Sequence, residues 1–223
     1  MAPCRVIFFD VGNTLLFPNR RRILAPLREE SHPTLEQWHA LERRTKREFD
    51  QGMLGGSVDH GFWWKFYTHL LEELNGAADD VREVLVENTQ NSGNWDQILP
   101  GTCEALQRIG RTHPIAVISN ADGRIENVLG RCGIAGCFRS ITDSGLVGYE
   151  KPHRVIFEAA LRQMKAQPEE SLYVGDVYSV DYVGARDAGM QGVLFDVAGA
   201  YRDSKLPRVE SLGALENWLE HQS

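Results

Sequence analysis

Two aspartates in this 223-residue sequence follow short apolar runs and have side chains suited to phosphoryl transfer. Asp10 ends the run 6–10, and Asp176 comes directly after the run 171–175. A carboxylate can attack phosphorus and carry the phosphoryl group as an aspartyl phosphate. Because nucleophile and phosphate are both anionic, such a site needs a cation, and Mg²⁺ held by one or two carboxylates suits it. The sequence therefore predicts an Mg²⁺ site between these aspartates, with Asp10 as the catalytic nucleophile.

Five further residues can complete such a site. Lys151 supplies fixed positive charge beside the nucleophile, and Ser119, with Asn120 next to it, is predicted to bind the phosphoryl oxygens. Gly12 lets the chain turn tightly and can give its carbonyl to the metal. Asp181 can orient the metal or ligate it through water. The predicted metal ligands are Asp10, Gly12, Asp176 and Asp181.

Compact apolar runs alternate with helical patterns, which predicts an α/β fold with a Rossmann-like parallel sheet. Such runs are expected for strands that are buried on both faces. The predicted strands are residues 6–10, 115–119, 171–175 and 192–195, with a weaker one at 139–142. The predicted helices are 102–111, 154–164, 179–188 with Ser179 as its N-cap, and a final stripe at 212–219.

The alternation of strands and helices is interrupted in residues 17–92, which contain no clear buried strand. Its patterns predict helices at 23–30, 34–50, 58–74 and 79–90, and Thr34 with Gln37 forms a capping-box pattern. We expect a core domain of residues 1–16 and 93–223 with an inserted α-helical cap of residues 17–92. Ligands of open parallel sheets bind at the carboxyl ends of the strands. An insert that leaves the sheet just after Asp10 can therefore fold over the site as a lid.

Composition argues against several other classes of function. The net charge of −7 disfavours general nucleic-acid binding, and no run approaches the ~20 apolar residues of a membrane helix. The cysteines Cys4, Cys103, Cys132 and Cys137 show neither a CxxC pair nor zinc spacing, which favours a reducing, cytoplasmic setting. The expected partner is a small phosphorylated molecule, and the oligomeric state stays open.

The candidate site residues, in order, resemble the four motifs of the haloacid dehalogenase-like (HAD) hydrolase superfamily. The matching segments are Asp10-x-x-x-Thr14-Leu15, Ser119-Asn120, Lys151-Pro152 and Gly175-Asp176-x-x-x-x-Asp181. The insert is similar to that of members with a helical cap between the first and second motifs. The resemblance implies a Rossmann-like core with a cap and Mg²⁺-dependent hydrolysis of phosphate monoesters. It also implies that Asp10 is the nucleophile, that Ser119 binds phosphate, that Lys151 balances charge and that Asp176 binds metal with Asp181 beside it.

The sequence departs from the phosphatases of this family at Gly12, where they carry a second aspartate that protonates the leaving group. Loss of a general acid typically slows a reaction by roughly 10²–10⁴-fold. Three functions stay open: a metal-dependent phosphatase without the usual acid, a hydrolase of carbon–halogen or carbon–phosphorus bonds, and a catalytically weak binding protein. The carbon–phosphorus reaction in the family uses a cap lysine, for which Lys46 and Lys65 are available.

Two groups of residues near these motifs have simpler interpretations. Asp122 is the acid nearest to Ser119-Asn120, and we interpret it as a helix N-cap. Trp63, Trp64 and Phe66 are aromatic at helical spacing, which is typical of packing residues.

Overall fold

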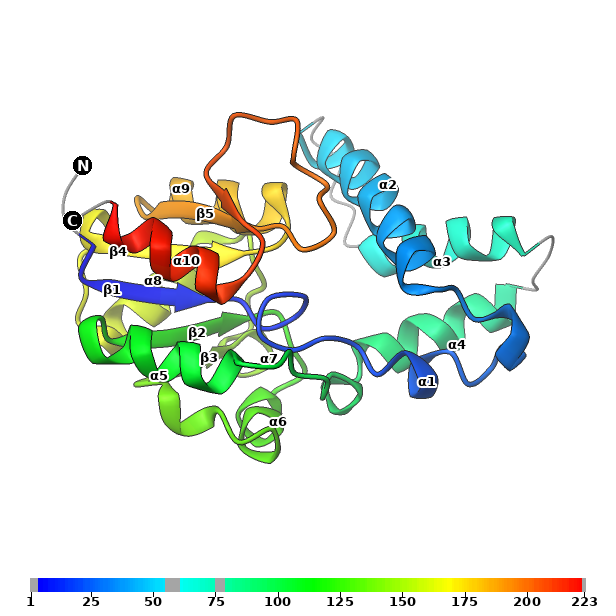
Figure 1. Cartoon of the computed structure of the whole chain (residues 1–223), viewed down its shortest axis with the longest axis horizontal. Coiled ribbons are helices and arrows are strands. Elements are labelled where there is room, and N and C mark those ends of the chain that lie inside the picture. Colours follow the sequence, from blue (N-terminus) through cyan, green and yellow to red (C-terminus); the bar gives the residue numbers. More distant parts are fainter. Residues whose placement is uncertain (1–3, 55–60, 75–78, 222–223) are drawn as a thin grey trace.

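The computed structural model describes residues 4–54, 61–74 and 79–221. In these ranges the chain forms a parallel sheet with helices on both faces, and a separate group of helices lies at one end of the sheet (Figure 1). The strands found there are β1 (Val6–Phe9), β2 (Ile115–Ser119), β3 (Ile141–Asp143), β4 (Ser171–Gly175), β5 (Gln191–Phe195) and β6 (Arg208–Val209). The predicted α/β class and Rossmann-like sheet are confirmed.

The strands are ordered β3-β2-β1-β4-β5-β6. The winding of the chain therefore reverses between β1 and β4. Such a reversal opens a crevice at the carboxyl ends of the two strands, where ligands of doubly wound folds bind. Phe9 at the end of β1 pairs with Val174 of β4, which brings Asp10 and Asp176 to the same edge of the sheet.

Alternate residues of β1 enter two separate apolar layers. Ile7 and Phe9 pack in the layer beneath α5 (Thr102–Thr112), α6 (Ile125–Arg131) and α10 (Leu212–Glu220). Val6 and Phe8 pack in the layer beneath α8 (Arg154–Met164) and α9 (Val183–Asp187). This period of two is that of a strand buried on both faces. The helices of this part of the chain are α5 (Thr102–Thr112), α6 (Ile125–Arg131), α7 (Ser144–Val147), α8 (Arg154–Met164), α9 (Val183–Asp187) and α10 (Leu212–Glu220).

Residues 17–92, which we call the helical unit, have an apolar core of their own in their described part. Trp38, Leu41, Phe66 and Leu85 are among the side chains buried in it. Figure 1 shows the helical unit beyond the carboxyl ends of the strands. Its helices are α1 (Arg20–Ile23), α2 (Leu35–Leu54), α3 (Phe62–Glu73) and α4 (Asp79–Gln90). Short 3₁₀ turns of the described chain lie at Glu29–Ser31, Ser92–Asn94, Ala135–Cys137 and Pro168–Glu170.

Helix α2 begins where the capping box predicts. The Thr34 backbone N–H donates to Gln37 Oε1 at 2.8 Å, and the Gln37 N–H donates to Thr34 Oγ1 at 3.3 Å. This reciprocal pair satisfies two donors that a helix start leaves open. None of the helices in the described ranges is long and apolar enough to span a bilayer.

One face of α2 contacts the core through polar groups at helical spacing. Arg43 donates to the Ala198 carbonyl at 3.0 Å. Two turns further on, Asp50 accepts from the Ser179 backbone N–H at 3.0 Å and from the Tyr201 hydroxyl at 2.8 Å. Because these residues share one stripe of the helix, α2 is held against the core on the side of the strand ends.

Two predicted helices differ from the structure, one in its position and one in its first turn. The helix predicted at 23–30 ends at Ile23, because Pro26 lacks an N–H and disfavours helical backbone before it. The segment predicted as 179–188 begins as a π turn, Tyr178–Tyr182, before α9. Ser179 is not its N-cap, because Ser179 lies inside the π turn and Val177 precedes that turn as the N-cap.

The remaining differences concern the ends and the number of elements. Helix α2 continues to Leu54 rather than residue 50, and α3 begins at Phe62. Residues 58–60 of the helix predicted at 58–74 lie outside the described residues. Strand β6 has no counterpart among the predicted strands, because two residues are too few to give an apolar pattern.

Candidate active site

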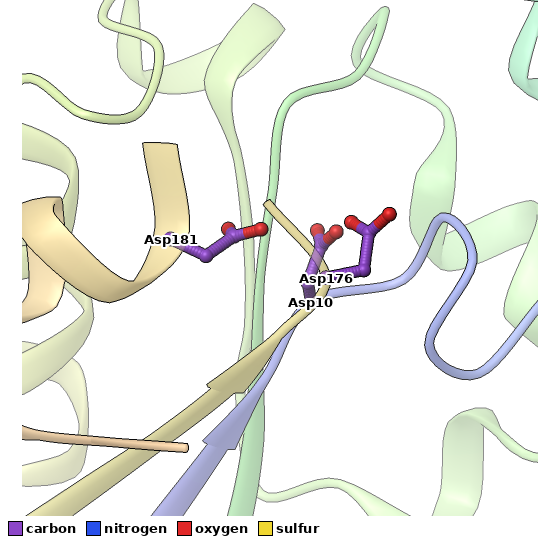
Figure 2. A group of neighbouring side chains, drawn as sticks. All are labelled: Asp10, Asp176 and Asp181. Atoms are coloured by element: carbon purple, nitrogen blue, oxygen red, sulfur yellow. The ribbon is translucent and has the colours of Figure 1, made fainter. Parts of the chain in front are cut away.

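Three aspartates converge at the carboxyl ends of β1 and β4. Asp10 and Asp176 directly follow these neighbouring parallel strands, and Asp181 projects from the π turn that comes next (Figure 2). Each offers a carboxylate oxygen within 4.8 Å of those of the other two, and all three side chains are buried. The pairing of β1 with β4 thus brings together Asp10 and Asp176, which lie far apart in the sequence.

Lys151 lies at the centre of this cluster. Its Nζ donates to Asp10 Oδ1 and to Asp181 Oδ1, both at 2.7 Å, and to the Tyr173 hydroxyl at 2.8 Å. The Tyr173 hydroxyl is itself 3.0 Å from Asp181 Oδ1 and 3.2 Å from the Ile118 carbonyl. The ammonium group is therefore held on three sides, which fixes its charge next to Asp10.

Both carboxylate oxygens of Asp181 have protein donors. Oδ1 accepts from Lys151, and Oδ2 accepts from the Val177 backbone N–H at 2.9 Å. The side chain packs so closely against Gly175 that a Cβ on that glycine would lie 2.5 Å from Asp181 Cγ. Glycine at position 175 is thus a steric requirement, and Asp181 is tied to the lysine and the turn.

The Ser119 and Asn120 side chains lie in different settings. Ser119, the last residue of β2, lines the cavity in front of the aspartates. The Asn120 amide spans the backbone of Lys151: its Oδ1 accepts from the Lys151 N–H at 2.7 Å and its Nδ2 donates to the Lys151 carbonyl at 3.0 Å. Asn120 therefore holds Lys151 in place.

A lysine of the helical unit also reaches the cluster. Lys46 on α2 places Nζ 2.9 Å from Asp176 Oδ2 and 2.8 Å from Glu42 Oε1, and its side chain is 1% exposed. The contact with Asp176 lies outside hydrogen-bond geometry, so Oδ2 is a buried oxygen without a hydrogen-bond donor. Of the two available lysines of the helical unit, Lys46 is the one that touches a predicted site residue.

The loop after Asp10 turns back on itself around Gly12. The N–H groups of Thr14, Leu15 and Leu16 donate to the Val11 carbonyl, and Asn13 N donates to the Leu16 carbonyl. The Gly12 carbonyl takes no part in these bonds, so it keeps its acceptor capacity.

The space in front of Gly12 is filled by a tryptophan. A Cβ built on Gly12 would lie 3.3 Å from Trp95 Cζ3, which is tight for an added side chain. Trp95 is held in turn by a 2.7 Å bond from its Nε1 to the Thr89 carbonyl. Trp95 thus occupies the volume into which an acid at position 12 would project.

A cavity of about 510 Å³ opens over the aspartates between the sheet and the helical unit. This is within the usual range for small-molecule sites. Asp10, Ser119 and Lys151 line its polar end, and residues of α2 and α3, including Trp63, line the other. Trp63 therefore faces the cavity as well as packing, whereas Trp64 is 40% exposed.

Burial shifts the acids of the site toward the neutral form. Desolvation, opposed by Lys151 and reinforced by Asp181 and Asp176, raises the pKa of Asp10 to about 7. Desolvation, opposed by Lys46 and reinforced by Asp181 and Glu42, raises the pKa of Asp176 to about 6. Both shifts indicate that burial disfavours the charged form of these two carboxyl groups more than the nearby lysines favour it.

The donor set suits a hard divalent cation. The available ligands are carboxylate oxygens and the Gly12 carbonyl, which are the ligand types that Mg²⁺ prefers. Asp176 Oδ2 is buried, and its ion pair with Lys46 Nζ at 2.9 Å lies outside hydrogen-bond geometry, so this oxygen can also bind a metal cation.

Comparison with known proteins agrees with the fold and the motifs. The model of the haloacid dehalogenase-like hydrolase family matches residues 4–189. The chain therefore belongs to the haloacid dehalogenase-like hydrolases and is a hydrolase of that family.

Two relatives are similar to this chain over most of its length and of their own. Haloacid dehalogenase-like hydrolase domain-containing protein 3 of Homo sapiens is 30% identical over 210 residues, which cover 85% of this chain and 81% of that protein. Phosphoserine phosphatase of Thermus thermophilus is 30% identical over 223 residues, which cover 86% of this chain and 88% of that enzyme. Among solved structures, the putative HAD-hydrolase YfnB of Bacillus subtilis, bound to magnesium, superposes on this chain with a TM-score of 0.69. The two sequences are 18% identical, and the match covers 97% of this chain and 99% of that one. This similarity shows a shared fold.

The sequence patterns do not single out three residues of this region. Tyr173 lies inside β4, where an aromatic residue is typical of the core. Trp95 is in a linker, and no sequence pattern places it against Gly12. Lys46 is one of two available lysines, and its i+4 spacing from Glu42 is the signal that separates it from Lys65.

Proposed function

We propose that the chain is an Mg²⁺-dependent phosphatase of small phosphate monoesters that acts through an aspartyl phosphate on Asp10. The observation that carries this proposal is the convergence of Asp10, Asp176 and Lys151 at the carboxyl ends of two neighbouring strands. The phosphatase name of a relative that is 30% identical over most of both chains supports the same reaction.

The roles of the site residues follow from their contacts. Asp10 Oδ1 is held by Lys151, which leaves Oδ2 to attack phosphorus. Ser119 and nearby backbone amides bind the phosphoryl oxygens. Lys151 offsets the charge of Asp10, and Asn120 with Asp181 positions that lysine.

Asp10, Asp176 and the Gly12 carbonyl would hold Mg²⁺, with Asp181 as an outer partner. When bound, the ion offsets the charge that the nucleophile and the phosphate share. Asp176 suits this role, because its Oδ2 is a buried carboxylate oxygen at the end of β4. Lys46 stands beside the same oxygen, so it adds positive charge to this part of the pocket.

The helical unit, residues 17–92, is proposed to be the cap, and residues 1–16 with 93–223 the catalytic core. Its docked helix α2 and the cavity beneath it support this division. A cytoplasmic location belongs to the same proposal, since all four cysteines are free thiols, as suits a reducing compartment.

The structure favours neither alternative hydrolase reaction. Haloacid cleavage in this family needs no metal, whereas the pocket gathers three carboxylates. A Schiff-base lysine must be neutral to attack a carbonyl. Burial lowers the pKa of Lys46, but Asp176 and Glu42 outweigh it and raise the pKa well above its usual value.

Phosphate release from a panel of phosphate monoesters, with and without Mg²⁺, tests the proposal. Release that requires both Mg²⁺ and Asp10 is expected. Halide release from 2-haloacids without metal, or no release from any ester in the panel, would refute it.

A further inference from the structure

One side of the cavity is a row of aromatic rings. Phe49 of α2 and Phe62 of α3 lie 5.5 Å apart between ring centroids, Phe62 and Trp63 lie 5.0 Å apart, and Trp63 and Trp95 lie 5.6 Å apart. All three contacts are edge-on, and all four rings line the cavity. We call these four residues the aromatic wall.

The aromatic wall ends at the position where a general acid is missing. Trp95, its last member, is the residue that fills the space next to Gly12. The phosphoryl end of the cavity is formed by Asp10, Ser119 and Lys151. A substrate bound with its phosphate at that end therefore places its leaving group against the aromatic rings. The loop that directly follows Asp10 has no acidic side chain to offer there.

Two independent observations therefore limit the leaving group. The wall favours a flat, apolar group that can contact ring edges and faces. The glycine at position 12 favours a group that departs without a proton from the protein. A phenol meets both conditions, because its pKa is about 10 in tyrosine, against about 15.7 for water, which an aliphatic alcohol resembles.

On the basis of the proposed phosphatase function, we propose that this enzyme acts on aryl phosphates, with the aromatic leaving group bound by Phe49, Phe62, Trp63 and Trp95. Asp10 Oδ2 forms a bond to phosphorus while the bond from phosphorus to the phenolic oxygen breaks. The electron pair of that bond stays on the oxygen, which leaves as phenolate and takes a proton from water after release. Water then attacks the aspartyl phosphate, which gives inorganic phosphate and restores Asp10.

The first experiment measures how the rate depends on the leaving group. The purified enzyme with Mg²⁺ is given 4-nitrophenyl, phenyl, 4-methoxyphenyl and butyl phosphate, and kcat/KM is determined for each. We expect kcat/KM to fall steadily as the pKa of the leaving group rises, and phenyl phosphate to exceed butyl phosphate by ~100-fold or more. Equal values for butyl and phenyl phosphate would overturn the inference and leave the phosphatase function standing.

The second experiment measures binding without turnover. Phenylphosphonate and methylphosphonate, which cannot lose a phenol or an alcohol, are titrated calorimetrically into the Mg²⁺-loaded protein. We expect phenylphosphonate to bind ~10-fold more tightly or better. Equal affinities would refute the aromatic wall as a binding surface.

Two variants on α3 separate binding from general packing. Phe62→Leu removes one ring of the wall, and we expect it to reduce the preference for phenylphosphonate by about 2–10-fold. Trp64→Leu is the matched control, because Trp64 is exposed and stacks on Arg82 at 4.0 Å rather than on the cavity. An equal loss of preference in both variants would contradict the inference.

The two experiments keep the two hypotheses apart. If no ester is hydrolysed, the phosphatase proposal fails and with it the aryl phosphate reaction, while the phosphonate titration still decides whether the wall binds aromatic groups. If esters are hydrolysed without preference for aryl groups, the inference fails alone.

Discussion

Lys46 Nζ of the helical unit lies 2.9 Å from Asp176 Oδ2 at the end of β4. The lysine is almost fully buried, and its second partner is Glu42 one turn earlier on α2. A side chain of the helical unit thus contacts a carboxylate that the metal site requires. This contact links the docking of α2 to the charge of the site.

Replacement of Lys46 should make the protein depend more strongly on Mg²⁺. Lys46→Met leaves Asp176 and Glu42 buried without their cation, so the free energy of unfolding without metal should fall by about 3–5 kcal/mol. Mg²⁺ would then bind Asp176 without competition from an ammonium group. The rise in melting temperature on addition of Mg²⁺ should therefore be larger in the variant than in the wild type.

Arg47→Met is the control for this experiment. It removes the same charge from the next residue of α2, but Arg47 is exposed and its Nε donates to the Arg43 carbonyl of the same helix. Its response to Mg²⁺ should match that of the wild type. The same Mg²⁺-dependent shift in both variants would show that Lys46 does not compete for the site.

Asp10→Asn should abolish phosphate release and leave the fold intact. The amide cannot form the bond to phosphorus, and removal of a nucleophile lowers kcat by roughly 10³-fold or more. Asp187→Asn, at an exposed position of α9, should retain full activity. Thermal unfolding of both variants checks folding, and residual release by Asp10→Asn at more than a few per cent of the wild type would exclude Asp10 as the nucleophile.

Much of the site was predictable because it depends on strand ends. Asp10, Ser119 and Asp176 each mark the end of a buried strand, and parallel strands bring their carboxyl ends to one edge. The convergence of the aspartates is a consequence of that rule. The apolar runs that mark such strands are the strongest local signal in this chain.

The contacts that the sequence does not predict join distant segments. Ser179 looks like an N-cap from its neighbours alone, but it lies inside the π turn, where its backbone N–H donates to Asp50 of α2. Asn120 looks like a phosphate ligand, yet both ends of its amide bond to the backbone of Lys151. Trp95 next to Gly12 depends on how the helical unit returns to the core, which no local pattern encodes.

Asp122 joins the end of the helical unit to the core and should make stability depend on acid. It accepts from the Ser92 backbone N–H at 3.2 Å and from Ser92 Oγ at 2.6 Å, and it pairs with Arg124. Burial raises the pKa of Asp122, but the bonds from Arg124 and Ser92 outweigh it and lower the pKa from 3.8 to about 2.

The sign of the effect follows from this depressed pKa. Between about pH 4 and pH 2 the unfolded chain takes up a proton at Asp122 that the folded chain does not, so stability falls as the pH falls. The stability advantage of the wild type over Asp122→Asn should be constant above about pH 4 and shrink below it. Urea unfolding of both proteins at a series of pH values measures this difference.

Ser92→Ala gives a second check on the same contact. It removes the Ser92 hydroxyl donor and keeps the backbone N–H, so its acid-dependent loss of stability should lie between those of the wild type and Asp122→Asn. A difference between wild type and Asp122→Asn that does not change across the acid range would contradict the assignment.

Gly12 and Trp95 compete for one volume, which decides what an acid at position 12 can do. In Gly12→Asp the new Cβ would lie 3.3 Å from Trp95 Cζ3, so we expect a loss of about 1–3 kcal/mol in stability from overpacking. The carboxylate would also be misplaced, and hydrolysis of butyl phosphate should not improve.

In Gly12→Asp with Trp95→Leu, the space is open and the acid can protonate an alcohol, so kcat/KM for butyl phosphate should rise ~100-fold over Trp95→Leu alone. Gly12→Asn with Trp95→Leu has the same shape without the proton, and an equal rise in that variant would show that the acid is not the cause.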